Sequence, residues 1–257
     1  MAHPTALIQA LRGAAGGHPI TSILSVAALT AVLGGVLAQH AGWPQRHVVA
    51  GWLAYAVLGA VVALAASARL GRAPFGLANQ VTLLRAGLVC LIGGALLASG
   101  QAPLMSWSLA GLIATALALD AVDGWLARRL RLATAFGARF DVEVDALLLL
   151  ILTVLVWQAD RVGVWVLAIG LLRYGFVVAG QLAPRLRAPL PPSRRRKVVA
   201  AQQGVTLLLC LLPPVAGWLA SAAAAVALIC LALSFAVDVL GLARRGAAPA
   251  SGMSKRA

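Results

Sequence analysis

Five of the seven acidic residues of this 257-residue chain lie between Asp120 and Asp145, in sequence that is otherwise apolar. A carboxylate at membrane depth costs roughly 2.5–3.5 kcal/mol on insertion scales. Several carboxylates in such a stretch therefore require compensating positive charge, and we expect a divalent metal ion with a chemical role. The four candidate metal ligands are Asp120, Asp123, Asp141 and Asp145.

The spacing of these carboxylates predicts two helix faces that meet. Asp120 lies three residues before Asp123, so the two share one face of a helix. Asp141 and Asp145 are four residues apart and share a face of the next helix. Carboxylate oxygens suit Mg²⁺ or Mn²⁺ and suit zinc or copper poorly, and two such ions would neutralise four carboxylates. Ions of this kind usually take their remaining ligands from water and substrate phosphates.

Small residues accompany the carboxylates on the same two helices. Gly124, Ala127 and Gly137 leave room either for close helix packing or for a nucleotide against the backbone. Arg128 directly follows Ala127 and either offers a fork of donors to a phosphate or caps the end of a helix. Both interpretations stay open for each residue.

The elements that position these residues are apolar helices. The chain is 61% hydrophobic and 11% charged, whereas soluble domains are about 25% charged. Its apolar stretches are long enough to cross a bilayer core of about 30 Å. We therefore predict an all-α integral membrane protein, with no separate soluble domain. Eight spans are expected, at 20–39, 48–68, 81–99, 104–130, 141–157, 162–183, 198–217 and 219–242.

The basic residues predict the topology. The net charge is +14, but the cations lie in short loops between apolar stretches, which indicates anionic lipid headgroups rather than nucleic acid. They crowd alternate loops, most densely at 185–197, so both termini are expected to be cytoplasmic. An interfacial belt is expected at the opposite ends of the spans, made of Trp43, Trp52, Trp107, Trp157, Trp165 and Trp218. The charge pattern and the absence of a disulfide framework fit a bacterial inner membrane.

The acidic stretch as a whole resembles a known signature. The family is the CDP-alcohol phosphatidyltransferases, and the matching string is Asp120-x2-Asp123-Gly124-x2-Ala127-Arg128-x8-Gly137-x3-Asp141-x3-Asp145. Upstream, the segment from Asn79 through Thr82 to Arg85 is similar to the opening of the family's first core helix. The resemblance implies a six-helix core over 71–245. A two-helix transmembrane extension over 1–70 would precede this core, and a disordered cytoplasmic tail over 246–257 would follow it.

The resemblance also implies an enzyme activity. Asp120, Asp123 and Asp141 would bind the metal ions, and Asp145 would complete that metal site and act as general base. The base would take the proton of an alcohol that attacks a CDP-linked lipid, CDP-diacylglycerol above all, and CMP would leave. The CDP moiety would lie against Thr82, Gly124, Ala127, Arg128 and Gly137. Family relatives are commonly homodimers, so a homodimer is expected here.

The alcohol acceptor is predicted less directly. Ser193, Lys197 and Gln203 resemble a stretch of the phosphatidylglycerophosphate synthases, but Arg196 stands where that stretch has Gly, and Ala200 where it has Thr. The basic loop and Arg173, which lies within a span, favour an anionic acceptor. Candidates are glycerol 3-phosphate, an inositol phosphate and phosphatidylglycerol. We assign the acceptor's phosphate to Arg173, Arg196 and Lys197.

Two further acidic residues have predicted partners, and a second function remains open. Glu143 is expected to reach the interface or to pair with a loop arginine, and Asp238 to pair with nearby basic residues. Arg173 is expected to face the bundle and an acidic or phosphate partner. A cation- or proton-coupled transporter is the alternative function, because carboxylates within the membrane also mark ion pathways. Transporters more often show paired half-repeats, whereas this chain has one dense site.

Overall fold

The computed structural model describes residues 18–70, 75–97, 104–129, 134–182 and 193–246. Within them the chain forms eight α-helices and two short 3₁₀ helices, and no strand. The α-helices are α2 (Pro19–His40), α3 (Gln45–Leu70), α4 (Leu77–Gly94), α6 (Trp107–Arg129), α7 (Ala135–Gln158), α8 (Leu167–Leu182), α9 (Arg194–Cys210) and α10 (Gly217–Gly246). The 3₁₀ helices are η1 (Ala95–Leu97) and η2 (Val164–Val166). The predicted all-α fold is therefore confirmed.

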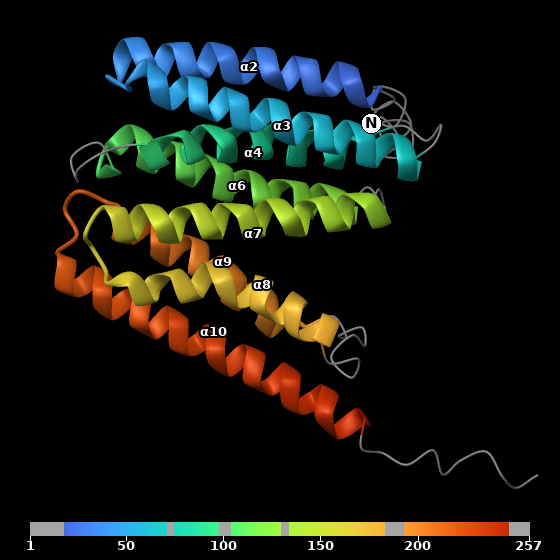
Figure 1. Ribbon diagram of the computed structural model, residues 1–257, viewed down its shortest axis with the longest axis vertical. Coiled ribbons are helices and arrows are strands. Elements are labelled where there is room, and N and C mark those ends of the chain that lie inside the picture. Colours follow the sequence, from blue (N-terminus) through green and yellow to red (C-terminus); the bar gives the residue numbers. More distant parts are fainter. Residues whose placement is uncertain (1–17, 71–74, 98–103, 130–133, 183–192, 247–257) are drawn as a thin grey trace, which may run out of the picture.

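Successive helices run in alternating directions across the molecule (Figure 1). Helix α4 lies at the centre, because it packs against α2 and α3 on one side and against α6 and α7 on the other. Helices α8, α9 and α10 continue the bundle beyond α7, and α10 forms its far edge (Figure 1). This order places α4, α6 and α7, which carry the acidic motif and its flanking segment, next to one another.

Four helices of the described part are long and apolar enough to cross a membrane: Pro19–His40, Gln45–Arg69, Leu77–Leu97 and Gly217–Gly241. Shorter apolar segments lie at Trp107–Val122 and Val164–Gly175. Helix α7 is also long, but its first half carries the charged residues of the motif. The chain is thus a helical membrane protein by length and composition, and the expected number of eight crossings stays a prediction.

Glycines allow the first two helices to dock on α4 at backbone distance. A Cβ atom on Gly94 would lie only 2.0 Å from the carbonyl oxygen of His47, and one on Gly51 would lie 2.9 Å from the Cα atom of Leu91. Side chains larger than hydrogen would therefore force α3 and α4 apart. Small residues allow such close approach in membrane helix packing. Helices α2 and α3 thus cover one face of the helix that carries Arg85, although the predicted domain boundaries stay untested.

The predicted tryptophan belt lies at the end of the bundle away from the carboxylates. Five of its six members are partly exposed: Trp52, Trp107, Trp157, Trp165 and Trp218. Trp43 differs, since it is 7% exposed and its indole Nε1 donates a hydrogen bond to Ser108 Oγ at 3.0 Å. The bundle therefore has an aromatic end and a charged end, while the assignment of the charged end to the cytoplasm stays a prediction.

Candidate active site

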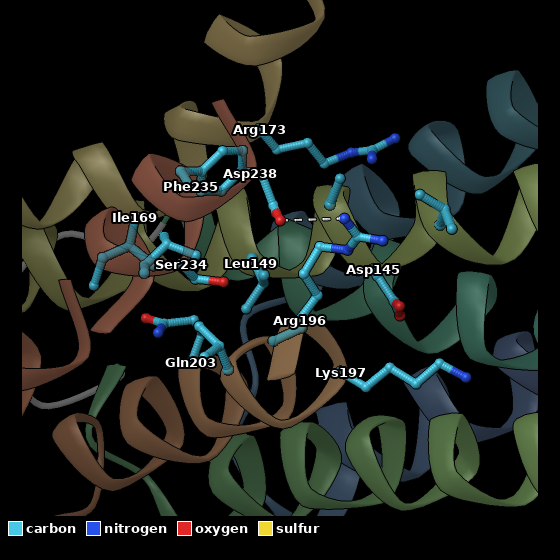
Figure 2. A pocket seen from close by; sticks show the side chains of 15 residues that line it. Asp145, Leu149, Ile169, Arg173, Arg196, Lys197, Gln203, Ser234, Phe235 and Asp238 are labelled. Carbon is cyan, nitrogen blue, oxygen red and sulfur yellow. Dashed lines mark ion pairs between the residues drawn. The ribbon is translucent and has the colours of Figure 1, made fainter. Parts of the chain in front are cut away.

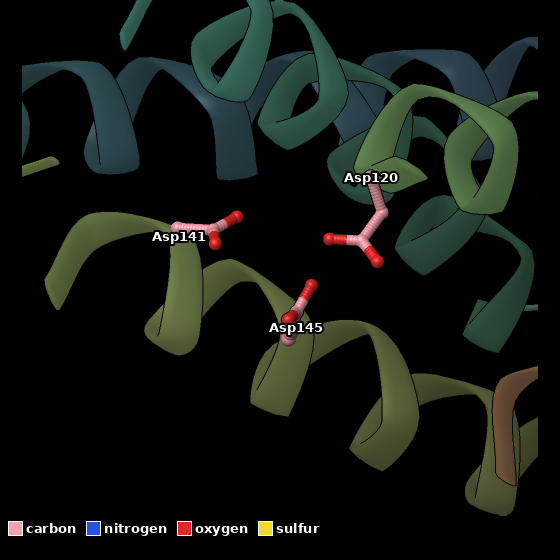
Figure 3. A group of neighbouring side chains, drawn as sticks. All are labelled: Asp120, Asp141 and Asp145. Carbon is pink, nitrogen blue, oxygen red and sulfur yellow. The ribbon is translucent and has the colours of Figure 1, made fainter. Parts of the chain in front are cut away.

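Three motif carboxylates converge between α6 and α7. One carboxylate oxygen from each of Asp120, Asp141 and Asp145 lies within 4.8 Å of the others. Asp120 reaches in from α6, and the other two project from successive turns of α7 (Figure 3). All three are half-buried. Helices α6 and α7 make little direct contact in the described part of the chain, and α4, which packs against both, brings the two predicted carboxylate faces together.

The start of α7 is set by local contacts that fix the register of Asp141 and Asp145. Thr134 is the N-cap, and its hydroxyl oxygen accepts a hydrogen bond from the backbone N–H of Gly137 at 2.9 Å. A Cβ atom on Gly137 would lie 2.3 Å from Asn79 Oδ1 of α4. Gly137 therefore leaves room for the Asn79 side chain of α4, which supports the packing interpretation of this small residue.

Arg85 occupies the space between the three carboxylates. Its side chain is 0% exposed. Its guanidinium forms ion pairs with Asp120 on α6 and with Asp141 on α7, and its Nη1 lies 3.1 Å from Asp145 Oδ1. Its Nη2 also donates to the backbone carbonyl of Asp141 at 3.3 Å. One buried cation on α4 therefore ties together the two helices of the acidic motif.

Sequence reasoning placed Arg85 in a flanking motif and assigned it no role in the site. A signal was present, because an arginine that lies eight residues into an apolar helix needs a partner at that depth. The acidic stretch was the largest supply of carboxylates. The prediction assigns the compensating charge to metal ions alone and therefore misses Arg85.

The carboxylate cluster fits a hard divalent cation by its chemistry. It supplies only oxygen ligands, which Mg²⁺ and Mn²⁺ prefer, and they lie within the span of one site. The three contacts to Arg85 given above use Oδ1 atoms, and a carboxylate has two oxygens with about four lone-pair sites in total. The guanidinium and a metal ion can therefore share these groups.

The remaining motif residues lie around this cluster or outside the described side chains. Gly124 is half-buried on α6. Thr82 is buried on α4, one turn before Arg85, and its hydroxyl donates to the carbonyl of Ala78 at 3.0 Å. Asp123, Ala127 and Arg128 belong to α6, but their side chains are outside the described part of the structure.

A cavity of about 430 Å³ adjoins the cluster, between α7, α8, α9 and α10. Asp145 lines it and so belongs to both regions (Figure 2). All three predicted acceptor cations line it as well, namely Arg173 on α8 and Arg196 and Lys197 on α9. Arg196 and Ala200, where the chain departs from the phosphatidylglycerophosphate synthase stretch, are both among its walls. The sequence predicts site roles for residues of α7, α8 and α9, and the tertiary structure brings these residues to one cavity.

Two further carboxylates, besides Asp145, lie beside the cations of this cavity. Glu143 Oε1 lies 2.6 Å from Arg173 Nη2, so its partner is an arginine of α8 and not the predicted loop arginine. Asp238 on α10 pairs with Arg195 and lies 3.4 Å from Arg196 Nη1, which confirms its expected pairing with basic residues (Figure 2). The expectation that Arg173 faces an acidic partner is confirmed too.

The fold and these two adjoining regions define a helical membrane protein with an acidic cluster beside a basic cavity. The chain belongs to the CDP-alcohol phosphatidyltransferase family, whose model matches residues 75–237, more than half of its length. Comparison with the curated proteins and with the solved structures gives no match to this chain. Membership supports a transferase that moves a phosphatidyl group from a CDP-alcohol to an alcohol in phospholipid synthesis. The family is typically dependent on divalent metal.

Proposed function

We propose that this protein transfers a phosphatidyl group from CDP-diacylglycerol to an anionic alcohol, releasing CMP, with Mg²⁺ or Mn²⁺ at the acidic cluster. The observation that carries the proposal is the convergence of Asp120, Asp141 and Asp145, three motif carboxylates from two helices, at one point. The family match supports this class of reaction, and the convergence of the motif carboxylates supports its location at the cluster.

Asp145 is the proposed general base. It is the one carboxylate of the cluster that also lines the cavity, so it lies between donor and acceptor. There it takes the proton of the acceptor hydroxyl, and the hydroxyl oxygen forms a new bond to the lipid-side phosphorus of the donor. The bond from that phosphorus to the oxygen of CMP breaks, and CMP leaves with the electron pair.

Asp120, Asp123 and Asp141 are the proposed metal ligands, with Asp145 as a fourth. Two ions would balance the four carboxylates, and when bound they would supply positive charge to the phosphoryl oxygens and to the departing CMP. Arg85 holds the carboxylates of α6 and α7 at a fixed separation. Thr82, Gly124, Ala127, Arg128 and Gly137 remain the proposed surroundings of the CDP moiety.

The cavity cations are the proposed acceptor site. Arg173, Arg196 and Lys197 offer charge-assisted hydrogen bonds, which are the strong ones for a phosphate. The charged groups of these three side chains lie on the side of the cavity where Asp145 lies (Figure 2). An acceptor whose phosphate is held there presents a nearby hydroxyl to the base. The homodimer and the bacterial inner membrane remain predictions from the resemblance and the charge pattern.

The test is CMP release by the purified protein in detergent with CDP-diacylglycerol. Release should require Mg²⁺ or Mn²⁺ and one acceptor from a panel of anionic and neutral alcohols. The same protein with EDTA is the control. Absence of CMP release with every acceptor, from folded protein that binds divalent metal, would contradict the proposal and favour the transporter.

A further inference from the structure

We propose that Arg85 is a built-in counter-ion that makes divalent metal binding depend on the CDP-lipid donor. In the free protein its guanidinium cancels part of the negative charge of the acidic cluster, so a metal ion alone binds weakly. The diphosphate of the donor restores negative charge, and metal and donor therefore bind cooperatively. This inference rests on the proposed transferase function, and it adds a positioning residue and a coupling between two ligands of the same site.

Arg85 lies on the interior side of the cluster. Its side chain is 0% exposed, whereas those of Asp120, Asp141 and Asp145 are 41%, 33% and 42% exposed. The carboxylates therefore lie between the guanidinium and the exterior of the bundle. A metal ion or a nucleotide can approach them from their exposed side, and Arg85 binds them from behind without blocking that approach.

Arg85 also links α6 and α7 in a way that needs no metal ion. Its guanidinium pairs with Asp120 of α6 and with Asp141 of α7, and its Nη1 lies 3.1 Å from Asp145 Oδ1. Helices α6 and α7 make little direct contact in the described part of the chain, whereas α4 packs against both. The cluster therefore keeps its geometry before an ion binds, but with reduced negative charge.

The charge of Arg85 limits how many ions the cluster holds by itself. The three described carboxylates carry three negative charges and the guanidinium cancels one, so one divalent ion neutralises the remainder. Asp123, whose side chain is outside the described part, adds at most one negative charge. The diphosphate of a CDP-linked donor brings about two more, and hard cations usually complete their ligands with substrate phosphates.

The repulsion between Arg85 and a bound ion is large enough to control metal affinity. A unit charge about 6 Å from a divalent ion weakens its binding by well over tenfold at an effective dielectric constant of about 20. Removal of the guanidinium has a second effect in the same direction. The carboxylates would then lack their common partner, and a metal ion would relieve that cost. A neutral residue at position 85 should therefore tighten metal binding.

The first arm of the experiment measures Mn²⁺ binding to the unchanged protein in detergent by titration calorimetry, alone and with CDP or cytidine. CDP carries the diphosphate of the donor, whereas cytidine has the base and sugar without it. Titrations without protein correct for Mn²⁺ bound to free CDP. CDP should tighten Mn²⁺ binding at least about tenfold, Mn²⁺ should tighten CDP binding by the same factor, and cytidine should change neither. Equally tight Mn²⁺ binding with and without CDP would overturn the inference.

The second arm repeats these titrations with variants of Arg85. Arg85→Gln should bind Mn²⁺ at least about tenfold more tightly without CDP and lose most of the effect of CDP. Arg85→Lys keeps the charge and should keep that effect. Arg69→Gln, which removes a charge from an exposed position on α3, is the matched control and should behave like the unchanged protein. A purely structural role of Arg85 would lower stability and leave the effect of CDP as it is, which would overturn the inference.

The first arm uses no variant, so it tests the inference even if Arg85→Gln does not fold. Failure of the inference and failure of the proposed function give different results. Mn²⁺-dependent CMP release, together with an Mn²⁺ affinity that depends on neither CDP nor Arg85, would overturn the inference and keep the proposed function. Absence of both Mn²⁺ binding and CMP release would remove the two together.

Discussion

The acidic cluster and the basic cavity adjoin at Asp145 but compensate their charges in opposite ways. In the cluster one arginine, 0% exposed, faces three carboxylates, so negative charge is in excess. Around the cavity the described cations Arg173, Arg195, Arg196 and Lys197 meet Glu143, Asp238 and the shared Asp145, so positive charge is in excess by one. Arg173 and Arg196 are about one-third exposed, unlike Arg85. The difference shows a site divided into a part suited to cations and a part suited to an anion.

Burial makes the two regions differ in rigidity as well as in charge. Ion pairs removed from water are strong, and they are costly when one partner is lost. Half-exposed pairs are weaker, because solvent screens them. The contacts of Arg85 therefore hold a fixed geometry across three helices, whereas the contacts of Arg173 and Arg196 can exchange for those of a substrate phosphate. Changes to single residues can test each side of this contrast.

The largest effect is expected for Asp145→Asn, which removes the group shared by both regions. CMP release should fall by at least about 100-fold, because a general base typically contributes 10²–10⁴-fold. Binding of the CDP-lipid should be retained, as measured by ligand-dependent thermal stabilisation. Asp160→Asn, on the aromatic end of the bundle, is the matched control and should leave turnover unchanged. Loss of both turnover and donor binding would indicate that Asp145 acts mainly as a metal ligand.

Arg85→Gln should lower stability strongly. Removal of one partner from a buried ion pair typically costs about 3–5 kcal/mol, and here three carboxylates would lose their common cation. Thermal unfolding in detergent measures the loss, and Mn²⁺ should recover part of it by replacing the missing charge. Arg69→Gln, at an exposed position on α3, should change stability by less than about 0.5 kcal/mol. An Arg85→Gln variant that is as stable as the unchanged protein without metal would contradict the inference that Arg85 holds the three carboxylates together.

Arg196→Ala should act on acceptor binding and leave the cluster intact. Loss of a charge-assisted hydrogen bond of about 1.5 kcal/mol corresponds to about a tenfold rise in the KM of the acceptor. The KM of the donor and the thermal stability should change little. Arg194→Ala, an exposed neighbour in the same helical turn that does not line the cavity, is the control. Equal effects of the two variants would indicate general surface charge instead of a binding site.

The smallest effect is expected for Asp238→Asn, which relieves Arg196 of a competing carboxylate. The side chains of Arg196 and Asp238 are 30% and 11% exposed, and a long, partly screened pair of this kind contributes about 1 kcal/mol at most, so the KM of an anionic acceptor should fall by about fivefold at most. Initial rates at low acceptor concentration measure this change. A rise in this KM would show that Asp238 orients Arg196 for the substrate and does not compete with it.

The spacing of residues along the sequence predicts much of this arrangement. The spacing of Asp141 and Asp145 predicts a shared helix face, and the structure puts both in one cluster. The depth of Arg173 in an apolar span predicts a partner, and Glu143 is that partner. These predictions succeed because helical periodicity decides which side chains of one helix lie together, and because an unpaired charge in an apolar span is costly.

The sequence by itself determined the helices, the apolar character and the residues that carry charge, since these depend on local periodicity and composition. Only the tertiary structure decided which helices meet. Arg85 reaches the carboxylates because α4 packs against both α6 and α7, and the contact of Gly137 with Asn79 depends on the same packing. The four-helix cavity likewise exists only once α7 to α10 have assembled. Contacts between helices depend on the fit of whole surfaces, and no spacing along one helix encodes that fit.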